Sequence, residues 1–308
     1  MFGKNILLNI ILVAACTIFV AGCGNKNISG NVFEETAFEP SENTVPASSE
    51  ETLVIKLVVN EAYCQKTACS CVSDIASRDY QSLQDLLKEK YNIDLVLTYV
   101  TDEYYIKDSL FTGRYDGVIT KPWLAYMITP GSSFKFKRIV DLLDVYNNQW
   151  LRGMIITKSD SGLNTLKDID GKILAAGQED SFEKYHSPLR MLAQEKVVPK
   201  EIIHKASCSE NIGLLTEGNA DVAIISDYTL IASRFRYDLD PSQIRKIGET
   251  EPMPLCSVII DLSKISEENA LRLRNALLDL SGENAPEELS SDGFVMPAKW
   301  IPVPFETK

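Results

Sequence analysis

The sequence has few histidines and no excess of positive charge. Its 308 residues include two histidines, and 31 lysines and arginines stand against 43 acidic residues, for a formal net charge of −12 at pH 7. Nucleic-acid binding relies on basic side chains against phosphates, so this balance disfavours a nucleic-acid partner. The acidity does not exclude a small anionic ligand, because a pocket can be locally positive. Directed hydrogen-bond donors would then hold such an anion.

A long apolar run is also lacking. The apolar stretch near the N-terminus covers residues 6–20, which is too short for a confident membrane span. With Lys4 before it, the stretch is typical of a signal peptide. It ends in Val20-Ala21-Gly22-Cys23, and small residues directly before a cysteine resemble a bacterial lipobox, in which cleavage leaves an acylated cysteine first. An ordinary signal peptide with an incidental cysteine is the alternative.

The lipobox interpretation predicts the compartment and the anchor. Residues 1–22 are the expected lipoprotein signal peptide, and Cys23 is the expected lipidation site, which would hold the protein on the extracytoplasmic face of the cell membrane. The rest of segment 23–51 is rich in Asn, Ser, Thr, Glu and Pro. Such a segment buries too little apolar surface to offset its ordering entropy, so we expect a disordered tether. The remaining residues suffice for two modest lobes.

Paired CxxC motifs are absent, although there are seven cysteines. Cys64, Cys69 and Cys71 fall within eight residues. One interpretation is a soft-metal site, because thiolates suit copper(I), zinc and iron–sulfur clusters. The other is free thiols or a local disulfide with one thiol spare, which could pair with Cys208 or Cys256. Without the CxxC spacing of a strong zinc site, the disulfide or thiol interpretation is favoured, and no cofactor is expected.

No conventional catalytic motif is present, so we expect a binding protein and not an enzyme. A thiol enzyme stays as an alternative, with Cys208 or Cys69 as nucleophile and His186 as base. That chemistry needs hydrogen-bond contact between nucleophile and base, which a sequence does not show.

Short apolar strands alternate with helical patterns along the body. Leu83 and Leu87 share one face of a predicted helix, and Ser266 is a predicted helix N-cap. This alternation predicts an α/β protein with largely parallel sheets. The predicted strands cover residues 53–59, 93–100, 117–120, 152–157, 173–176, 222–225 and 258–260.

Four motifs occur in order along the body. They are the Gly113-to-Val118 stretch before a buried strand, the segment from Asp160-Ser161-Gly162 to Gly171-Lys172, the Glu179-Asp180-Ser181 helix start and the Gly218-to-Ala223 turn. This ordered set resembles the motifs of the phosphonate/phosphate-type periplasmic substrate-binding proteins of ABC importers, a family grouped with sulfonate-binding and transferrin-like proteins.

The resemblance implies a type II periplasmic-binding-protein fold, with two α/β lobes and a hinge. Lobe one would be residues 52–151 plus 254–308, and lobe two residues 152–253. The lobes would close over a small ligand, an anion in this family's pattern, and a membrane permease would bind the closed form. A ligand-sensing lipoprotein for a membrane receptor is the alternative.

Ser181 is the leading ligand-binding candidate that the resemblance implies. A helix N-terminus presents backbone amides and a positive dipole end to an anion, whereas a plain N-cap serine needs no ligand. Phe182 and Glu183 stand where the family usually has small hydroxyl residues. A lost donor and an added carboxylate should weaken binding of a doubly charged anion.

The other candidates follow from the same resemblance. Lys121 would supply positive charge and Trp123 an apolar or cation–π wall, the alternative being a solvated lysine and a core tryptophan. An acidic group at Asp227 could meet an amine or a ligand hydroxyl, or the residue could only form a turn. The remaining candidates are Tyr63, Tyr126, Tyr185, His186 and Ser209.

Overall fold

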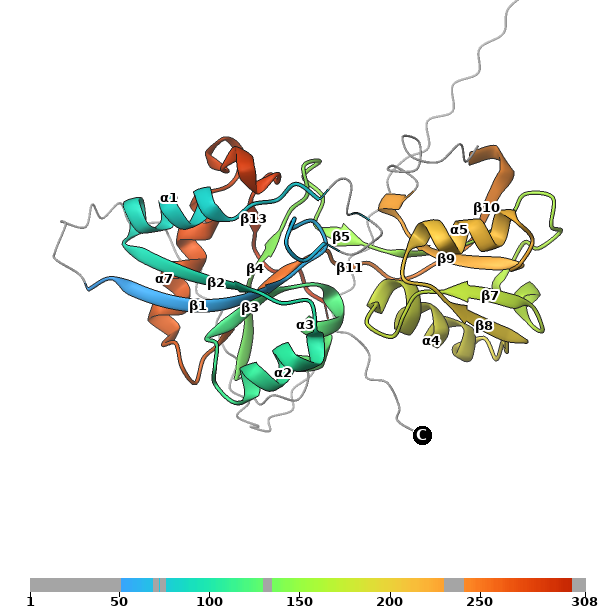
Figure 1. Ribbon diagram of the computed structural model, residues 1–308, viewed down its shortest axis with the longest axis horizontal. Coiled ribbons are helices and arrows are strands. Elements are labelled where there is room, and N and C mark those ends of the chain that lie inside the picture. The colour runs from blue at the N-terminus through green and yellow to red at the C-terminus, as the bar shows by residue number, and fades with distance from the viewer. Residues whose placement is uncertain (1–50, 69–71, 73–75, 130–134, 230–240, 301–308) are drawn as a thin grey trace, which may run out of the picture. The chain divides into compact units, whose positions relative to one another are not determined.

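The computed structural model describes residues 51–68, 72, 76–129, 135–229 and 241–300 (Figure 1). The predicted signal peptide, the lipidation site Cys23 and the tether up to residue 50 lie outside the described residues. Among the described residues, none of the helices has the length and apolar character needed to span a membrane.

The first sheet has six strands in the order β13-β4-β12-β3-β1-β2. Its parallel half consists of β1 (Leu53–Asn60), β2 (Ile93–Tyr99) and β3 (Gly117–Thr120). Its antiparallel half consists of β12 (Ser257–Asp261), β4 (Phe136–Leu142) and β13 (Phe294–Val295).

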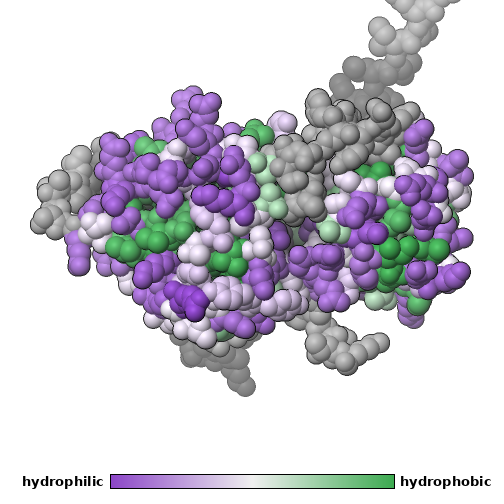
Figure 2. All heavy atoms as spheres, in the orientation of Figure 1, coloured by the Kyte–Doolittle hydropathy of each residue, from purple (hydrophilic) through white to green (hydrophobic). Residues whose placement is uncertain are grey.

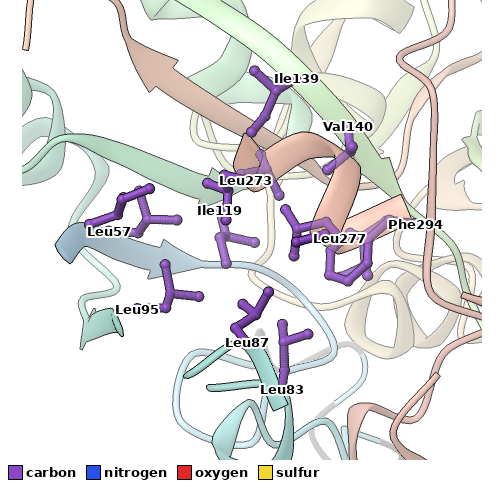
Figure 3. Packing of buried hydrophobic residues seen from close by; sticks show 14 of the residues in the cluster. Leu57, Leu83, Leu87, Leu95, Ile119, Ile139, Val140, Leu273, Leu277 and Phe294 are labelled. Carbon is purple, nitrogen blue, oxygen red and sulfur yellow. The ribbon is translucent and has the colours of Figure 1, made fainter. Parts of the chain in front are cut away.

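Helices cover both faces of the first sheet. Helices α1 (Gln81–Tyr91) and α7 (Glu267–Asp279) pack on the face that presents Leu57 and Ile119, as Figure 3 shows. Helices α2 (Glu103–Phe111) and α3 (Pro122–Ile128) pack on the opposite face, which presents Val58. Because both faces are buried along its second half, β1 has a continuous apolar run there, Leu57 to Val59, and not an alternating pattern.

The second sheet has five strands in the order β10-β6-β9-β7-β8. Helix α4 (Ser187–Gln194) packs on one face and α5 (Cys208–Thr216) on the other. The strands are β6 (Gly153–Lys158), β7 (Ile173–Ala176), β8 (Glu201–His204), β9 (Val222–Ser226) and β10 (Ile244–Glu249). A π-helix, η2 (Phe182–His186), precedes α4 directly.

A two-stranded ribbon joins the two sheets. It pairs β5 (Trp150–Leu151) with β11 (Met253–Pro254) in antiparallel fashion, at the points where the chain leaves the first sheet and returns to it. The expected two-lobe α/β architecture is therefore present. Short 3-10 turns complete the elements: η1 (Leu166–Ile169), η3 (Pro241–Gln243), η4 (Gly282–Asn284) and η5 (Glu287–Leu289).

The prediction of largely parallel sheets is wrong, because parallel strands make up only part of each sheet. Both sheets are mixed, because β12 runs antiparallel to β3 and β4, and β6 runs antiparallel to β9 and β10. The antiparallel strands are those on either side of the ribbon, where the chain crosses between the sheets without an intervening helix.

The described surface is mostly hydrophilic on the face that Figure 2 shows. An apolar patch lies over β1 and β2, where Val54 and Val96 are exposed. Exposed apolar side chains of this kind are common on the surface of folded domains.

Candidate functional site

Two parallel strands of the first sheet, β1 and β3, end in polar residues at the same edge. Asn60 is the last residue of β1 and Thr120 the last of β3, and they lie opposite each other in the strand register. The amide of Lys121 donates to the carbonyl of Asn60 (3.0 Å). In α/β folds, ligands bind outside the carboxyl ends of parallel strands, so this edge is the natural place for a site.

The side chain of Asn60 has a fixed orientation. Its Nδ2 donates to the carbonyls of Val100 and Thr101, at 3.0 Å each. Its Oδ1 is therefore the free acceptor, and it is buried without a hydrogen-bond partner among the described residues. The hydroxyl of Thr120 is likewise buried without a hydrogen-bond partner among the described residues. Buried polar atoms normally have a hydrogen-bond partner, so these two unpaired groups indicate that this edge has a functional role and not only a packing role.

A buried carboxylate completes this edge. Glu103 lies in the first turn of α2, which follows β2, and is 4% exposed. Its Oε1 forms an ion pair with Lys121 Nζ (3.1 Å), while its Oε2 has no hydrogen-bond partner among the described residues. Burial raises the pKa of Glu103 to about 7, Asp180 and Glu183 add to the rise, and Lys121 opposes it.

The ion pair changes the predicted role of Lys121. The lysine is present at the expected edge, but its positive charge is paired with Glu103. We refer to Asn60, Glu103 and Thr120 together as the acceptor edge.

An aromatic cluster connects this edge with the start of the second-sheet helices. Trp123 and Tyr126 of α3 stack on each other with ring centroids 5.4 Å apart. The His186 ring stacks on Trp123 at 3.6 Å, and Phe182 lies 5.1 Å from Tyr126. The structure thus brings together three predicted residues, Trp123, Tyr126 and His186. Trp300 also contacts Phe182, edge to face at 5.7 Å.

Ser181 acts as a helix N-cap. It precedes η2, is 8% exposed, and its Oγ accepts a hydrogen bond from the amide of Lys184 (3.2 Å). Burial lowers the pKa of His186, whose Nε2 lies 2.6 Å from the carbonyl of Glu179. The Ser181 hydroxyl at this helix start therefore already has a partner within the protein. Acidic side chains also lie in and just before the first turn of η2.

Glu183 extends the acidic character into the second lobe. It is buried, and its Oε1 accepts from the hydroxyl of Ser226 at the end of β9 (2.9 Å). The amide of Ser226 in turn donates to the Cys208 sulfur (3.4 Å). Cys208 thus packs beneath a carboxylate–serine pair.

Asp227 follows β9 directly and is half-buried. Its amide donates to the carbonyl of Arg152 (2.9 Å), and its Oδ1 accepts from the amide of Tyr228 (2.9 Å). Burial raises the pKa of Asp227 to about 6. Tyr228 meets the predicted residue Tyr63 edge to face at 5.9 Å.

The loop that carries Tyr63 is held by a buried ion pair. Arg78 and Glu61 are each 1% exposed and lie 3.0 Å apart, from Nη1 to Oε2. Arg78 also donates to the carbonyl of Leu289, and Glu61 accepts from the amide of Tyr63. Burial raises the pKa of the Tyr63 hydroxyl, which therefore stays protonated.

The two remaining candidates lie at the margins of the site. Tyr185 is half-buried and contacts His186 edge to face at 4.8 Å. Ser209 is half-buried in the first turn of α5, where Ser207 and not Ser209 forms the cap. Their contact with a ligand stays a prediction.

The cysteine predictions are covered only in part. Cys69 and Cys71 lie outside the described residues. Cys64, Cys208 and Cys256 are buried and form no disulfide with one another. Within the described ranges, no group of three His, Cys, Asp or Glu side chains could hold a metal ion.

The acceptor edge was missed by the sequence interpretation. Asn60 and Thr120 each end a strand that was predicted, so their position at a carboxyl edge was available as a signal. Glu103 gave none, because α2 was not predicted. Phe182 was noted only as a lost donor, whereas it lies at the centre of the aromatic cluster.

Comparisons with solved structures show the same fold. The chain is similar to XAC2383 from Xanthomonas citri bound to ATP, at 15% identity over 80% of this chain and 91% of that one, with a TM-score of 0.63. It is similar to PhnD1 from Prochlorococcus marinus in complex with methylphosphonate, at 13% identity, 81% and 94% coverage, and a TM-score of 0.57.

A third structure is more distant. The aliphatic sulphonate binding protein SsuA from Escherichia coli is 14% identical over 76% of this chain and 73% of that one, with a TM-score of 0.51. A search among curated proteins finds no match.

The family assignment comes from the sequence model that matches residues 72–299. That model describes the ABC transporter, phosphonate, periplasmic substrate-binding protein. The match includes α1, the acidic helix start at Glu103, the aromatic cluster up to residue 299 and the whole second sheet. The chain therefore belongs to the phosphonate-type family of periplasmic substrate-binding proteins of ABC transporters.

Proposed function

We propose that this chain is the extracytoplasmic, lipid-anchored solute-binding component of an ABC importer, with a membrane permease as its partner. The family consists of substrate-binding components of such transporters. The observation that carries the proposal for this chain is the gathering of Trp123 and Tyr126 from one lobe with Phe182 and His186 from the other, beside the acceptor edge. A small solute held there would contact both lobes and would favour their closure.

Lipid anchoring at Cys23 belongs to the same proposal. The proposal is supported by an apolar run, small residues and a cysteine that follow one another along the chain. A tether of residues 23–51 would let the lobes reach a permease. One lipid chain alone gives marginal membrane binding, which is why lipoproteins of this kind carry more than one.

The charge of the solute depends on which groups of the site remain available to it. A small anion is what the resemblance predicts, with Ser181 and Lys121 as its donors. Both groups have protein partners here, namely the Lys184 amide and Glu103. The acidic surroundings favour a different ligand class.

Uptake measurements test the transport role. A solute that raises the melting temperature of the purified chain is supplied in labelled form to cells with and without the gene. We expect deletion to abolish high-affinity uptake of that solute, and a plasmid copy to restore it. If the solute binds but uptake is unchanged in the deletion strain, the importer role is wrong, and a changed transcriptional response to the solute would then indicate a sensor.

A further inference from the structure

We infer that the acceptor edge of Asn60, Glu103 and Thr120 binds a cationic solute through its N–H groups, as a protonated amine or guanidinium would offer. This inference rests on the proposed function, because it names the ligand class of the same site. It replaces the small anion with a ligand of opposite charge.

The hydrogen-bonding capacity of the edge is the first reason. Asn60 Oδ1 and Glu103 Oε2 only accept when Glu103 is ionised, and the Thr120 hydroxyl accepts as well. Asn60 and Glu103 are more than nine-tenths buried. Because the Asn60 amide nitrogen is committed to two carbonyls, the side chain cannot flip to offer a donor. A ligand that satisfies these atoms must therefore donate.

The charge of the surroundings is the second reason. The carboxylates of Asp180 and Glu183 raise the pKa of Glu103, and Glu183 also raises that of Asp227. These carboxylates come from both lobes and lie close enough to repel one another. A bound cation would relieve this repulsion, whereas an anion would add to it.

The cations near the site do not reverse this balance. Lys121 is paired with Glu103, and Arg152 with Glu249 at 3.1 Å. Lys184 is buried within η2, where its amide is capped by Ser181. An anion would therefore have to compete with carboxylates for two of these three cations.

The aromatic cluster is the third reason. Trp123, Tyr126 and Phe182 lie beside these carboxylates, and aromatic rings attract organic cations through their negative faces. Acidic and aromatic side chains together suit an organic ammonium group better than phosphate or phosphonate, which need many hydrogen-bond donors.

The test compares two arms of ligands on the full chain by thermal shift, each at about 10 mM. The cation arm holds putrescine and agmatine, which carry N–H groups, and choline, which carries charge without them. The anion arm holds phosphate, methylphosphonate and methanesulfonate. We expect putrescine or agmatine to raise the melting temperature, choline to raise it less, and the anions to leave it unchanged.

The pH dependence has a definite sign. The pKa of Glu103 is raised to about 7 and that of Asp227 to about 6, and a cation binds the ionised carboxylates. Amine affinity should therefore rise between pH 6 and pH 8. The charged neighbours Asp180, Glu183, Lys121 and Arg152 are common to both measurements.

Two variants connect the binding with the edge. At pH 8, Glu103→Gln should weaken amine binding about tenfold or more, since it removes the charge. Thr120→Val, which keeps the side-chain shape, should weaken it severalfold. The matched control Thr98→Val, at an exposed position of β2, should leave the affinity within about twofold.

Three results would overturn the inference. The first is a shift with an anion and none with an amine. The second is amine binding that Glu103→Gln and Thr120→Val leave unchanged. The third is no shift with any amine at either pH. None of these results contradicts the importer role, which the uptake experiment tests with whichever solute binds.

Discussion

At the residue scale, Glu103 combines burial with a mixed set of charged neighbours. Its carboxylate has one cationic partner, Lys121, and two acidic neighbours, Asp180 and Glu183. Ionising such a group costs free energy, and a positively charged ligand would offset that cost by binding to the carboxylate. The site is therefore less stable in the absence of its ligand than its packing alone would allow.

This burial predicts a pH-dependent stability. A raised pKa in the folded state means that the neutral form is favoured by folding, so the contribution is fully present below the unfolded value of 4.5 and is lost as pH rises through about 7. Glu103→Gln cannot ionise. We expect the variant to gain about 1–3 kcal/mol over the wild type at pH 8 and little at pH 5, as measured by urea unfolding.

An exposed glutamate provides the control for this measurement. Glu283→Gln, in η4, should give a stability curve parallel to that of the wild type. A constant difference between Glu103→Gln and the wild type from pH 5 to pH 8 would contradict the account. Asp227, whose pKa is also raised, titrates in both proteins and cancels from the comparison.

The sequence singled out several side chains next to recognisable motifs, and their contact with a ligand stays a prediction. Trp123, Tyr126 and His186 were placed by their motifs, and the structure brings them into contact. Glu103 escaped because its burial depends on packing between α2, α3 and the second lobe. The partners of Lys121 and Ser181 likewise depend on tertiary contacts that local pattern does not encode.

At the element scale, the start of η2 is positioned by a close backbone approach. A Cβ at Gly153 of β6 would lie 1.9 Å from the carbonyl oxygen of Glu183. Only glycine fits there, so β6 sets the height of the π-helix above the second sheet. This height determines where Phe182 and His186 meet the α3 side chains.

Gly153→Ala should therefore displace the π-helix. The contact is with backbone and cannot be relieved by a side-chain rotation, so we expect a loss of about 2–4 kcal/mol in unfolding free energy. Gly213→Ala is the matched control, because a Cβ in that position of α5 meets nothing within 4 Å. The control should be neutral or gain up to about 1 kcal/mol from helix propensity.

Ligand binding gives a second measurement on the same variant. If Gly153→Ala folds, its affinity for any solute found by thermal shift should fall more than that of Gly213→Ala. Equal stability and equal affinity in the two variants would show that the approach of β6 to η2 does not position the site.

Most strands that the sequence predicted are buried on both faces, the exception being the edge strand β2, where Val96 and Thr98 are exposed. Strands β1, β3, β7 and β9 each consist of apolar residues between turns, and their predicted limits fall within one residue of the observed ones. Strand β4 was missed because Phe136–Leu142 contains three charged residues. Its Asp141 is buried with Arg138 as partner, at 2.6 Å, and such pairing is invisible before the fold is known.

At the scale of the whole molecule, the two-lobe fold came from the resemblance and not from periodicity. Strand–helix alternation predicted the α/β class, but it did not predict the mixed direction of the sheets, because direction depends on how the chain crosses between lobes. The family model over residues 72–299 and the similar folds of solved structures confirm the architecture.

Membrane attachment is a property of the whole chain that can be tested directly. We expect Cys23→Ser to abolish incorporation of labelled palmitate and to move the protein from the membrane fraction to the soluble extracytoplasmic fraction. Cys16→Ser, within the predicted signal peptide, is the control and should leave the fractionation unchanged. Labelled Cys23→Ser protein that still sediments with membranes would contradict the lipobox interpretation.

The position of the ribbon β5–β11 also has a consequence for how the chain folds. The strands of the second sheet come from one uninterrupted stretch, β6 to β10, whereas the first sheet needs β12 between β3 and β4. A chain that emerges amino end first during synthesis and export presents all strands of the second sheet before β12 appears. The lobe that begins first along the chain is thus the one that is completed last.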